Sequence, residues 1–166
     1  MILKRVAEKI NQVLEGICMV FLVMLFVLLL SQVLARFAKI PTMSWTDETI
    51  QFFLAWFVFL GTAVLVHKAE HISVGLLPDR LTGIMQKLLQ VFILIIILVV
   101  AGFLIYGGSN LVHQMAGKKS PVLDLPQSFW YLSIPTSGVL IAFFSLAKLV
   151  ENLKLIKRGD TKAYGE

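Results

Sequence analysis

The chain has 166 residues, of which 58% are hydrophobic and 15% are charged, and its formal net charge is +5. Soluble domains are typically about half apolar and about a quarter charged, so this composition indicates a membrane protein. The basic excess does not indicate binding to nucleic acid, because the lysines and arginines flank apolar segments. The single cysteine, Cys18, excludes an intrachain disulfide.

Four stretches without Asp, Glu, Lys or Arg predict four transmembrane helices, at residues 16–35, 49–66, 88–112 and 125–147. About 20 helical residues, each advancing about 1.5 Å, cover a hydrocarbon core of about 30 Å, so each stretch is long enough to cross. The sequence therefore predicts an all-α integral membrane protein made of one membrane domain, with a tail at 148–166.

Residues 1–15, before the first span, place apolar side chains at helical spacing on one face and polar side chains on the other. This pattern predicts an amphipathic helix at the membrane interface, either continuous with the first span or hinged to it. A simple cytoplasmic extension of the span is the alternative. The apolar run exceeds the roughly 7–15 residues of a signal-peptide core, so we expect an uncleaved anchor.

In the second span, Ser44 to Asp47 has the form of a helix-capping box. Trp45 is expected near the outer interface, whereas the deeper Trp56 is expected to pack against another helix. In the fourth span, Pro135 lacks an N–H for the carbonyl of Tyr131. We therefore expect a kink there, and we favour a static kink over a moving hinge.

The distribution of lysine and arginine predicts the orientation. Eleven of the fifteen lie before the first span, between the second and third spans, or in the tail, and four lie in the other two loops. Basic loops favour the cytoplasmic side, so both termini are predicted to be cytoplasmic.

Charged groups within a bilayer are expensive and usually mark transport pathways, yet the middle of each predicted span lacks them. This absence argues against an independent small transporter or channel, which remains the first alternative function.

A membrane redox protein that holds haem is the second alternative. It is disfavoured because His67 is predicted at the inner end of the second span and His113 at the outer end of the third, so most of the membrane thickness separates them. His67 and His71 would share a helix face and could hold a metal, but no third ligand is evident. We therefore expect no metal, no cofactor and no catalytic residue, and hence no enzyme.

Several short motifs resemble a known family in their order and spacing. They are Trp45-Thr46-Asp47-Glu48 at an outer helix start, Trp56 and Gly61 within the second span, His71-Ile72 after it, and Tyr131, Ile134-Pro135 and Gly138 in the fourth span. This combination resembles the small permease subunit of TRAP transporters, the tripartite ATP-independent periplasmic carriers, over essentially the whole chain. The sialic-acid type is the sub-family that it resembles. One departure is Ala69-Glu70 before His71, where a smaller or glycine-containing turn would be expected.

The resemblance implies a three-part importer in the bacterial inner membrane. A periplasmic solute-binding protein would capture an organic acid, and a large multi-span subunit would carry it inward with sodium, which would bind on that partner. The present chain would be a non-catalytic scaffold, surrounded by membrane lipids and packed against the large subunit.

By the same resemblance, the subunit interface would comprise Trp45, Asp47, Glu48, Trp56, Gly61 and His71. A helix cap and an interfacial anchor are the alternative roles for the first three of these residues. The outer-loop residues that could meet the binding protein are Arg36, Lys39, Lys118 and Lys119, although for any single lysine a solvated surface charge is the favoured alternative.

Overall fold

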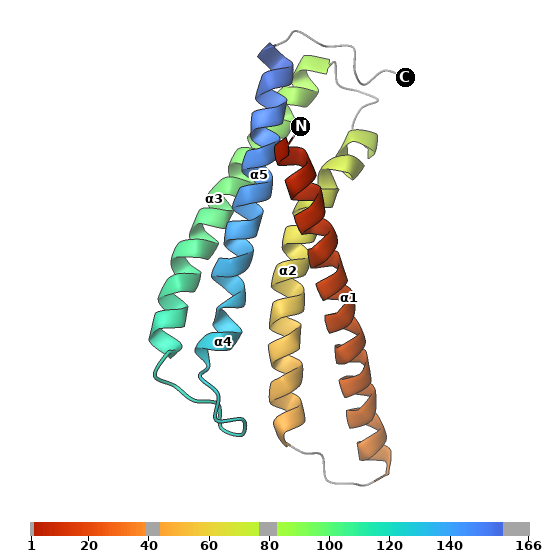
Figure 1. The fold of residues 1–166 in the computed structure, drawn as a ribbon, viewed down its shortest axis with the longest axis vertical. Helices are drawn as coiled ribbons and strands as arrows, with labels where there is room; N and C mark the ends of the chain where they lie inside the picture. Colours follow the sequence, from red (N-terminus) through yellow and green to blue (C-terminus); the bar gives the residue numbers. More distant parts are fainter. Residues whose placement is uncertain (1, 39–43, 77–82, 158–166) are drawn as a thin grey trace.

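The structure is a computed structural model that describes the backbone of residues 2–38, 44–76 and 83–157, and the side chains of residues 5–38, 45–68 and 89–150. The helices are α1 (Ile2–Phe37), α2 (Ser44–Leu76), α3 (Gly83–Met115), α4 (Ser128–Tyr131) and α5 (Ser133–Lys157) (Figure 1). Four segments are long and apolar enough to cross a membrane: Arg5–Phe37, Trp45–Lys68, Leu89–Met115 and Ser128–Val150. The predicted all-α fold with four membrane-spanning helices is confirmed.

The helices form a row in the order α1, α2, α5, α3. α3 packs mainly on α5, α5 also packs on α2, and α2 packs on α1, so that α1 and α3 lie at the two edges (Figure 1). The first turn of α1 and the last turns of α5 lie at the same end, as an even number of crossings requires. We call this the terminal end, and we call the opposite end, where α2 begins and residues 116–127 lie, the loop end.

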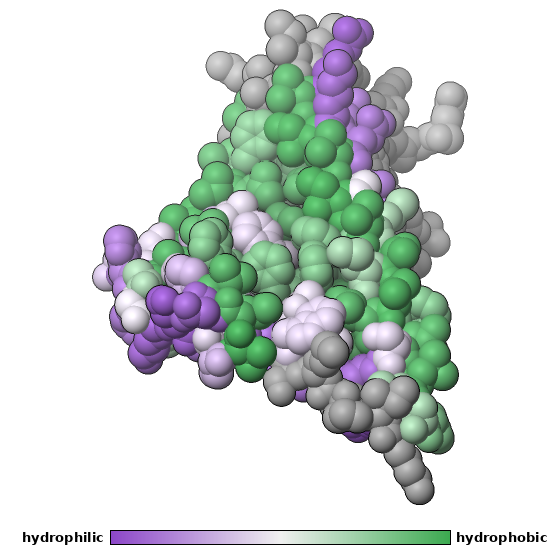
Figure 2. Space-filling view, turned by 60° about the horizontal axis from the view of Figure 1, so that its bottom comes forward, coloured by the Kyte–Doolittle hydropathy of each residue, from purple (hydrophilic) through white to green (hydrophobic). Residues whose placement is uncertain are grey.

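A row of helices leaves little interior. Between 11% and 33% of the residues in the most apolar window of each span are buried within the chain. Figure 2 shows the result as an apolar surface over the helices, with hydrophilic residues gathered toward the ends. An apolar helix surface of this extent is suited to lipid or to another membrane subunit, because water would not solvate it.

Residues 1–15 were predicted to form an amphipathic helix at the membrane interface, and α1 runs from Ile2 into the first span without a break. Part of their apolar stripe contacts the bundle: Ala7 and Leu14 are buried in the same cluster as Ala63 and Phe144. The polar Asn11, on the same stripe, is also buried. The helix therefore packs against its own chain along this stripe.

Small residues bring α3 and α5 close together. A Cβ atom added at Gly108 would lie 2.8 Å from Cδ of Pro135, and one added at Gly138 would lie 2.9 Å from Cγ1 of Ile105. Glycine at these two positions allows the backbones to approach, as is common between membrane helices.

The fourth span begins later than its predicted start at residue 125, because the backbone of residues 125–127 belongs to the preceding loop. The amide of Ser120 donates to the carbonyl of Leu125 (2.8 Å), and the amide of Gln127 donates to the carbonyl of Lys118 (2.9 Å). The helix then starts at Ser128.

Helix α4 and helix α5 are separated at Leu132, three residues before Pro135. Because proline has no N–H, the backbone cannot donate to the carbonyl of Tyr131 from position 135. The hydroxyls of Ser133 and Ser137 donate to backbone carbonyls three residues earlier, at 2.7 and 2.8 Å. Hydroxyl donors of this kind satisfy backbone groups near a proline in a membrane helix. Whether the helix also changes direction at Pro135 stays a prediction.

Candidate functional site

The carboxylate of Glu48, at the start of α2, holds the loop between α3 and α4. Its oxygens accept hydrogen bonds from the hydroxyl of Ser120 and from the amides of Val122 (3.1 Å) and Leu123 (3.0 Å). Carboxylates are strong acceptors for several convergent donors, and a charged acceptor strengthens each bond. A contact between residues more than 70 positions apart therefore fixes this loop to α2.

The loop itself has a hairpin-like shape. Lys119 and Pro126 form an isolated antiparallel bridge, and Asp124 adopts a positive φ of 52°. Aspartate tolerates this left-handed conformation better than most residues do. The ammonium of Lys119 lies 2.9 Å from the carboxylate of Asp124, but both side chains are largely exposed, so this pair contributes little stability.

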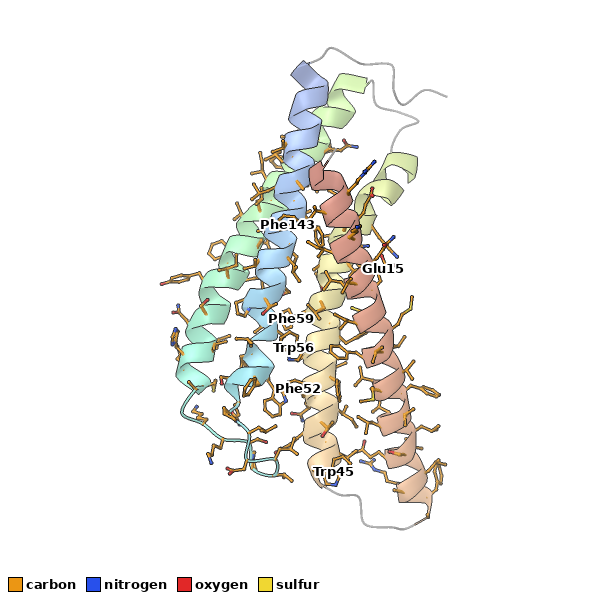
Figure 3. The ribbon with its side chains drawn as sticks, in the orientation of Figure 1. Glu15, Trp45, Phe52, Trp56, Phe59 and Phe143 are labelled. Carbon is orange, nitrogen blue, oxygen red and sulfur yellow. The ribbon has the colours of Figure 1, made fainter. Side chains whose placement is uncertain are left out.

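Asp47 and Trp56, which also belong to the predicted interface, make intrachain contacts as well. Asp47 accepts a hydrogen bond from the amide of Gln32, which joins α2 to α1. The indole N–H of Trp56 donates to the carbonyl of Phe129 at 3.2 Å. The rings of Phe52 and Trp130 meet edge to face with centroids 5.4 Å apart. Figure 3 shows Phe52 and Trp56 on the side of α2 that faces α4 and α5.

Trp45 and Gly61, two further residues of the predicted interface, lie on the surface of α2. Trp45 is 43% exposed, and a Cβ at Gly61 would meet nothing within 4 Å. The side chain of His71 lies outside the described residues, so the proposed His67–His71 pair is untested. Among the described side chains, no group of three or more His, Cys, Asp or Glu residues could hold a metal.

Three of the four predicted docking cations lie at the loop end, namely Arg36, Lys118 and Lys119, and all three are exposed. Lys39 lies outside the described residues. The structure therefore brings the basic residues that follow the first and third spans to the same end of the row, as four antiparallel crossings require (Figure 1).

Toward the terminal end, α5 is joined to α2 by a lysine. The ammonium of Lys148 donates to the carbonyls of His67 (2.5 Å) and Val66 (3.4 Å). The imidazole of His67 packs on the buried ring of Phe144, with centroids 4.9 Å apart. The location of His67 against an aromatic ring indicates a packing role.

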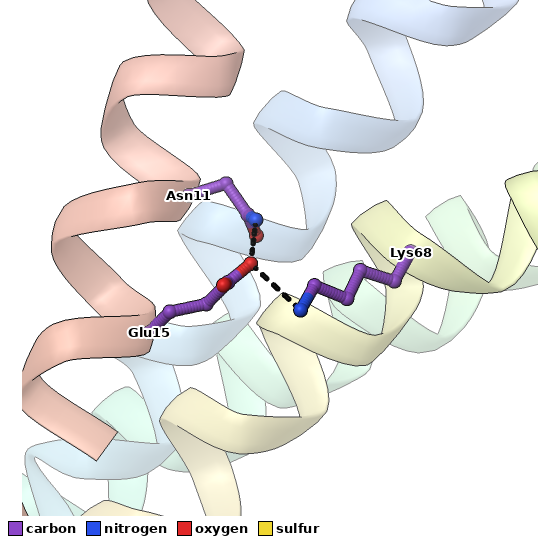
Figure 4. Close-up of polar contacts among 3 residues, drawn as sticks. All are labelled: Asn11, Glu15 and Lys68. Atoms are coloured by element: carbon purple, nitrogen blue, oxygen red, sulfur yellow. Dashed lines mark hydrogen bonds and ion pairs between the residues drawn. The ribbon is translucent and has the colours of Figure 1, made fainter. Parts of the chain in front are cut away.

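Sequence reasoning missed a polar cluster between α1 and α2. The amide of Asn11 donates to the carboxylate of Glu15, and the ammonium of Lys68 lies 3.1 Å from the same oxygen (Figure 4). A signal was present in the sequence, because Glu15 directly precedes the first apolar stretch and Lys68 follows the second. Antiparallel spans bring such flanking charges to the same membrane depth.

These two charged residues lie at one end of a surface groove of about 470 Å³ between α1 and α2. Apart from them, the side chains that line it are mainly apolar, and they include Met19, Val58 and Leu65. Gly61 and Thr62 also contribute to its wall.

Comparison with known proteins identifies the family. The family model described as "Tripartite ATP-independent periplasmic transporters, DctQ component" matches residues 25–155, which is most of the chain and includes three of its four spans in full. The chain belongs to this family. It is therefore a small permease subunit of a TRAP transporter, and the predicted family is confirmed.

Two relatives of similar length support this assignment. The chain is 27% identical to a protein of Haemophilus influenzae that carries the name of a TRAP transporter small permease, over 96% of this chain and 99% of the relative. It is 24% identical to the sialic acid TRAP transporter small permease protein SiaQ of Vibrio cholerae, over 93% of this chain and 89% of that protein.

A longer relative shows how such a subunit pairs. The chain is 26% identical to part of the isethionate TRAP transporter permease protein DctMQ of Oleidesulfovibrio alaskensis, covering 70% of this chain but 19% of that protein. There, a segment like this chain is one part of a much longer permease. TRAP small permease subunits thus pair with a large permease subunit, in this relative within a single polypeptide.

Proposed function

We propose that this chain is the non-catalytic scaffold of a sodium-coupled importer of organic acids, and that it packs along a larger subunit which carries the substrate. The observation that carries the proposal is the shallow row of helices. With at most a third of each span window buried, the chain encloses little space through which a polar solute could pass. The middle of each span also lacks the charged groups that line ion and substrate pathways.

The broad apolar faces of the row supply the surface for the partner. Val23, Val27 and Leu34 project from α1, at one edge of the row, and all are at least 56% exposed. Membrane helices associate through the close packing of such apolar faces. We propose that sodium and substrate bind on the large subunit and that this chain holds no cofactor.

We further propose that the terminal end is cytoplasmic and that the loop end faces the periplasm of the bacterial inner membrane. The excess of lysine and arginine at the terminal end supports this orientation. The loop end would then present Arg36, Lys118 and Lys119 to a soluble solute-binding protein. Glu48 would act as a positioning residue for that surface, because it fixes the loop that carries both lysines.

The proposed substrate class is taken from the names of the relatives. One relative is named for sialic acid and another for isethionate, and both compounds are organic acids. We propose an organic acid as the substrate, with sialic acid as the first compound to test.

Deleting the gene for this chain tests the scaffold role. Uptake of the substrate by cells or proteoliposomes should be lost, while binding by the isolated solute-binding protein is unchanged. Co-purification from the native membrane should yield the large subunit in equal amount. Unchanged uptake without this chain would refute the proposal, and solute flux through the purified chain alone would instead support an independent transporter.

The docking surface needs a separate test. Exchanging Lys118 and Lys119 for glutamate should weaken stimulation of uptake by the binding protein, especially at low salt, because the field at the loop end is reversed. Lys9 lies near the start of α1, toward the terminal end. Its exchange for glutamate is the matched control and should leave stimulation unchanged. Equal effects of the two exchanges would contradict docking at the loop end.

A further inference from the structure

The groove between α1 and α2 combines an ionic end with an apolar floor. Glu15 and Lys68 form the ionic end, and Met19, Val58 and Leu65 are among the apolar side chains along the rest of it. Gly61 keeps the groove open, because a Cβ at this position would meet nothing within 4 Å. Gly61 differs in this respect from Gly108 and Gly138, where side chains of a neighbouring helix fill the space that a Cβ would take.

From the sequence, we expect the ionic end to lie at the depth of lipid headgroups. Glu15 directly precedes the uncharged stretch 16–35, and Lys68 follows the uncharged stretch 49–66 by two residues. From Lys68, the α2 residues that line the groove extend back to Phe57. This stretch of helix is about 16 Å long, or about half of a hydrocarbon core of about 30 Å. The groove therefore spans about one leaflet.

The charged pair retains capacity to bind a ligand. Both the amide of Asn11 and the ammonium of Lys68 contact the same carboxylate oxygen of Glu15, Oε1. The second oxygen, Oε2, has no partner among the described side chains, and an ammonium has three donors of which this contact uses one. The side chains of Lys68 and Glu15 are 52% and 26% exposed, so both charges are accessible from the groove. Asn11 is 94% buried and holds Glu15 in place.

We propose that this groove is a binding site for a phospholipid with a zwitterionic ethanolamine headgroup. The headgroup phosphate would accept hydrogen bonds from Lys68, the ethanolamine ammonium would donate to Oε2 of Glu15, and one acyl chain would lie over Gly61. Glu15 disfavours an anionic headgroup without an ammonium through like-charge repulsion. It also disfavours a choline headgroup, whose trimethylated nitrogen has no N–H to donate.

The site can be tested on the complete complex with the large subunit. The complex is purified in mild detergent and supplied with equal amounts of ethanolamine, choline and glycerol phospholipids that carry identical acyl chains. Native mass spectrometry then counts the retained lipids. The wild-type complex should retain an ethanolamine phospholipid preferentially.

Two variants separate the roles of the groove and of its charge. Gly61→Leu fills the groove and should reduce retention of every lipid about tenfold, as expected if about two methylene groups of the acyl chain lose their place in the groove. Glu15→Gln should keep a bound lipid but reduce the preference for ethanolamine over glycerol headgroups about fivefold, since one charge-assisted hydrogen bond at a partly exposed site is lost. Gly102→Leu is the matched control, because a Cβ there also meets nothing within 4 Å, and it should change neither quantity.

A second measurement does not depend on the folding of Gly61→Leu. A photoreactive residue in place of Leu65, which lines the groove and is 65% exposed, should cross-link to lipid. Cross-linking to the large subunit instead would show that a protein helix fills the groove and would overturn the proposal. So would equal lipid loss in Gly61→Leu and Gly102→Leu, or an unchanged headgroup preference in Glu15→Gln. None of these outcomes would affect the proposed scaffold role, which co-purification tests separately.

Discussion

Replacing Gly108 by alanine tests how closely α3 and α5 must approach. The added Cβ would lie 2.8 Å from Cδ of Pro135, 2.9 Å from Cγ2 of Ile134 and 2.9 Å from the backbone nitrogen of Pro135. Non-bonded carbon atoms prefer separations of about 3.5–4.0 Å. The proline ring is closed onto its own backbone and cannot rotate away. The two helices must therefore move apart by roughly half an ångström or more, which is the difference between the contact distance with the added Cβ and the preferred separation.

The expected loss of stability combines two opposing effects. Overpacking a well-packed contact costs about 1–3 kcal/mol. Alanine in place of a helical glycine contributes about 0.5–1 kcal/mol in the opposite direction. The control variant Gly102→Ala has the second effect alone, since a Cβ there meets nothing within 4 Å. The difference between the two variants should therefore be about 1–3 kcal/mol, with the helix-propensity effect cancelled.

Unfolding in mild detergent, followed by tryptophan fluorescence over a graded denaturant series, measures this difference. Gly138→Ala should also destabilise, because its Cβ would lie 3.1 Å from the backbone nitrogen of Ile105. The double variant with Gly108→Ala should lose less than the sum of the single losses, since the first displacement of the helices relieves the second contact. If Gly108→Ala and Gly102→Ala are equally stable, the close approach of α3 and α5 is refuted.

Three further predictions address the loop end and the orientation of the chain. Glu48→Ala should make the amides of Val122 and Leu123 exchange with solvent hydrogen several-fold faster, roughly the effect of freeing a loop, while exchange in α3 is unchanged; unchanged exchange would contradict the fixed loop. Trp56→Phe should lower the free energy of unfolding by about 0.5–1.5 kcal/mol through loss of the hydrogen bond to the carbonyl of Phe129; a stability equal to that of the wild type would mean that this bond contributes nothing. In a Cys18→Ser background, a membrane-impermeant thiol reagent applied to intact spheroplasts should label a cysteine at position 119 and spare one at position 9; the reverse pattern would invert the proposed topology.

The four spans could be predicted from the sequence because the absence of charge over about 20 residues is a strong local signal. The family could be predicted as well, from the resemblance of short motifs such as Trp45-Thr46-Asp47-Glu48 and Ile134-Pro135, and the family model that matches residues 25–155 confirms it. The start of the fourth helix was harder to predict. An uncharged stretch does not show that the backbone of residues 125–127 pairs with the preceding loop.

The partners of the polar side chains could not be predicted, because they depend on which helices are neighbours. Asp47 lies in the first turn of α2, where it was expected, but the hydrogen bond that its carboxylate accepts from Gln32 on α1 was not expected. The adjacent Glu48 contacts a loop more than 70 residues away. Spans of nearly uniform apolarity carry little information about which face meets which neighbour. The helix order α1, α2, α5, α3 therefore emerged from the structure.

The same helix order determines how the chain can deform. At the loop end Glu48 joins α2 to the loop that follows α3, further along α2 Trp56 contacts α4, and near the other end Lys148 joins α5 to α2. The pair α1–α2 and the pair α3–α5 are thus held together at several points along the contact between α2 and α5. These contacts oppose a rotation of one helix pair against the other. A force applied to α1 or α3, at one edge of the row, would therefore tilt the four spans together as a rigid body. It would not separate α2 from α5 in the middle of the row.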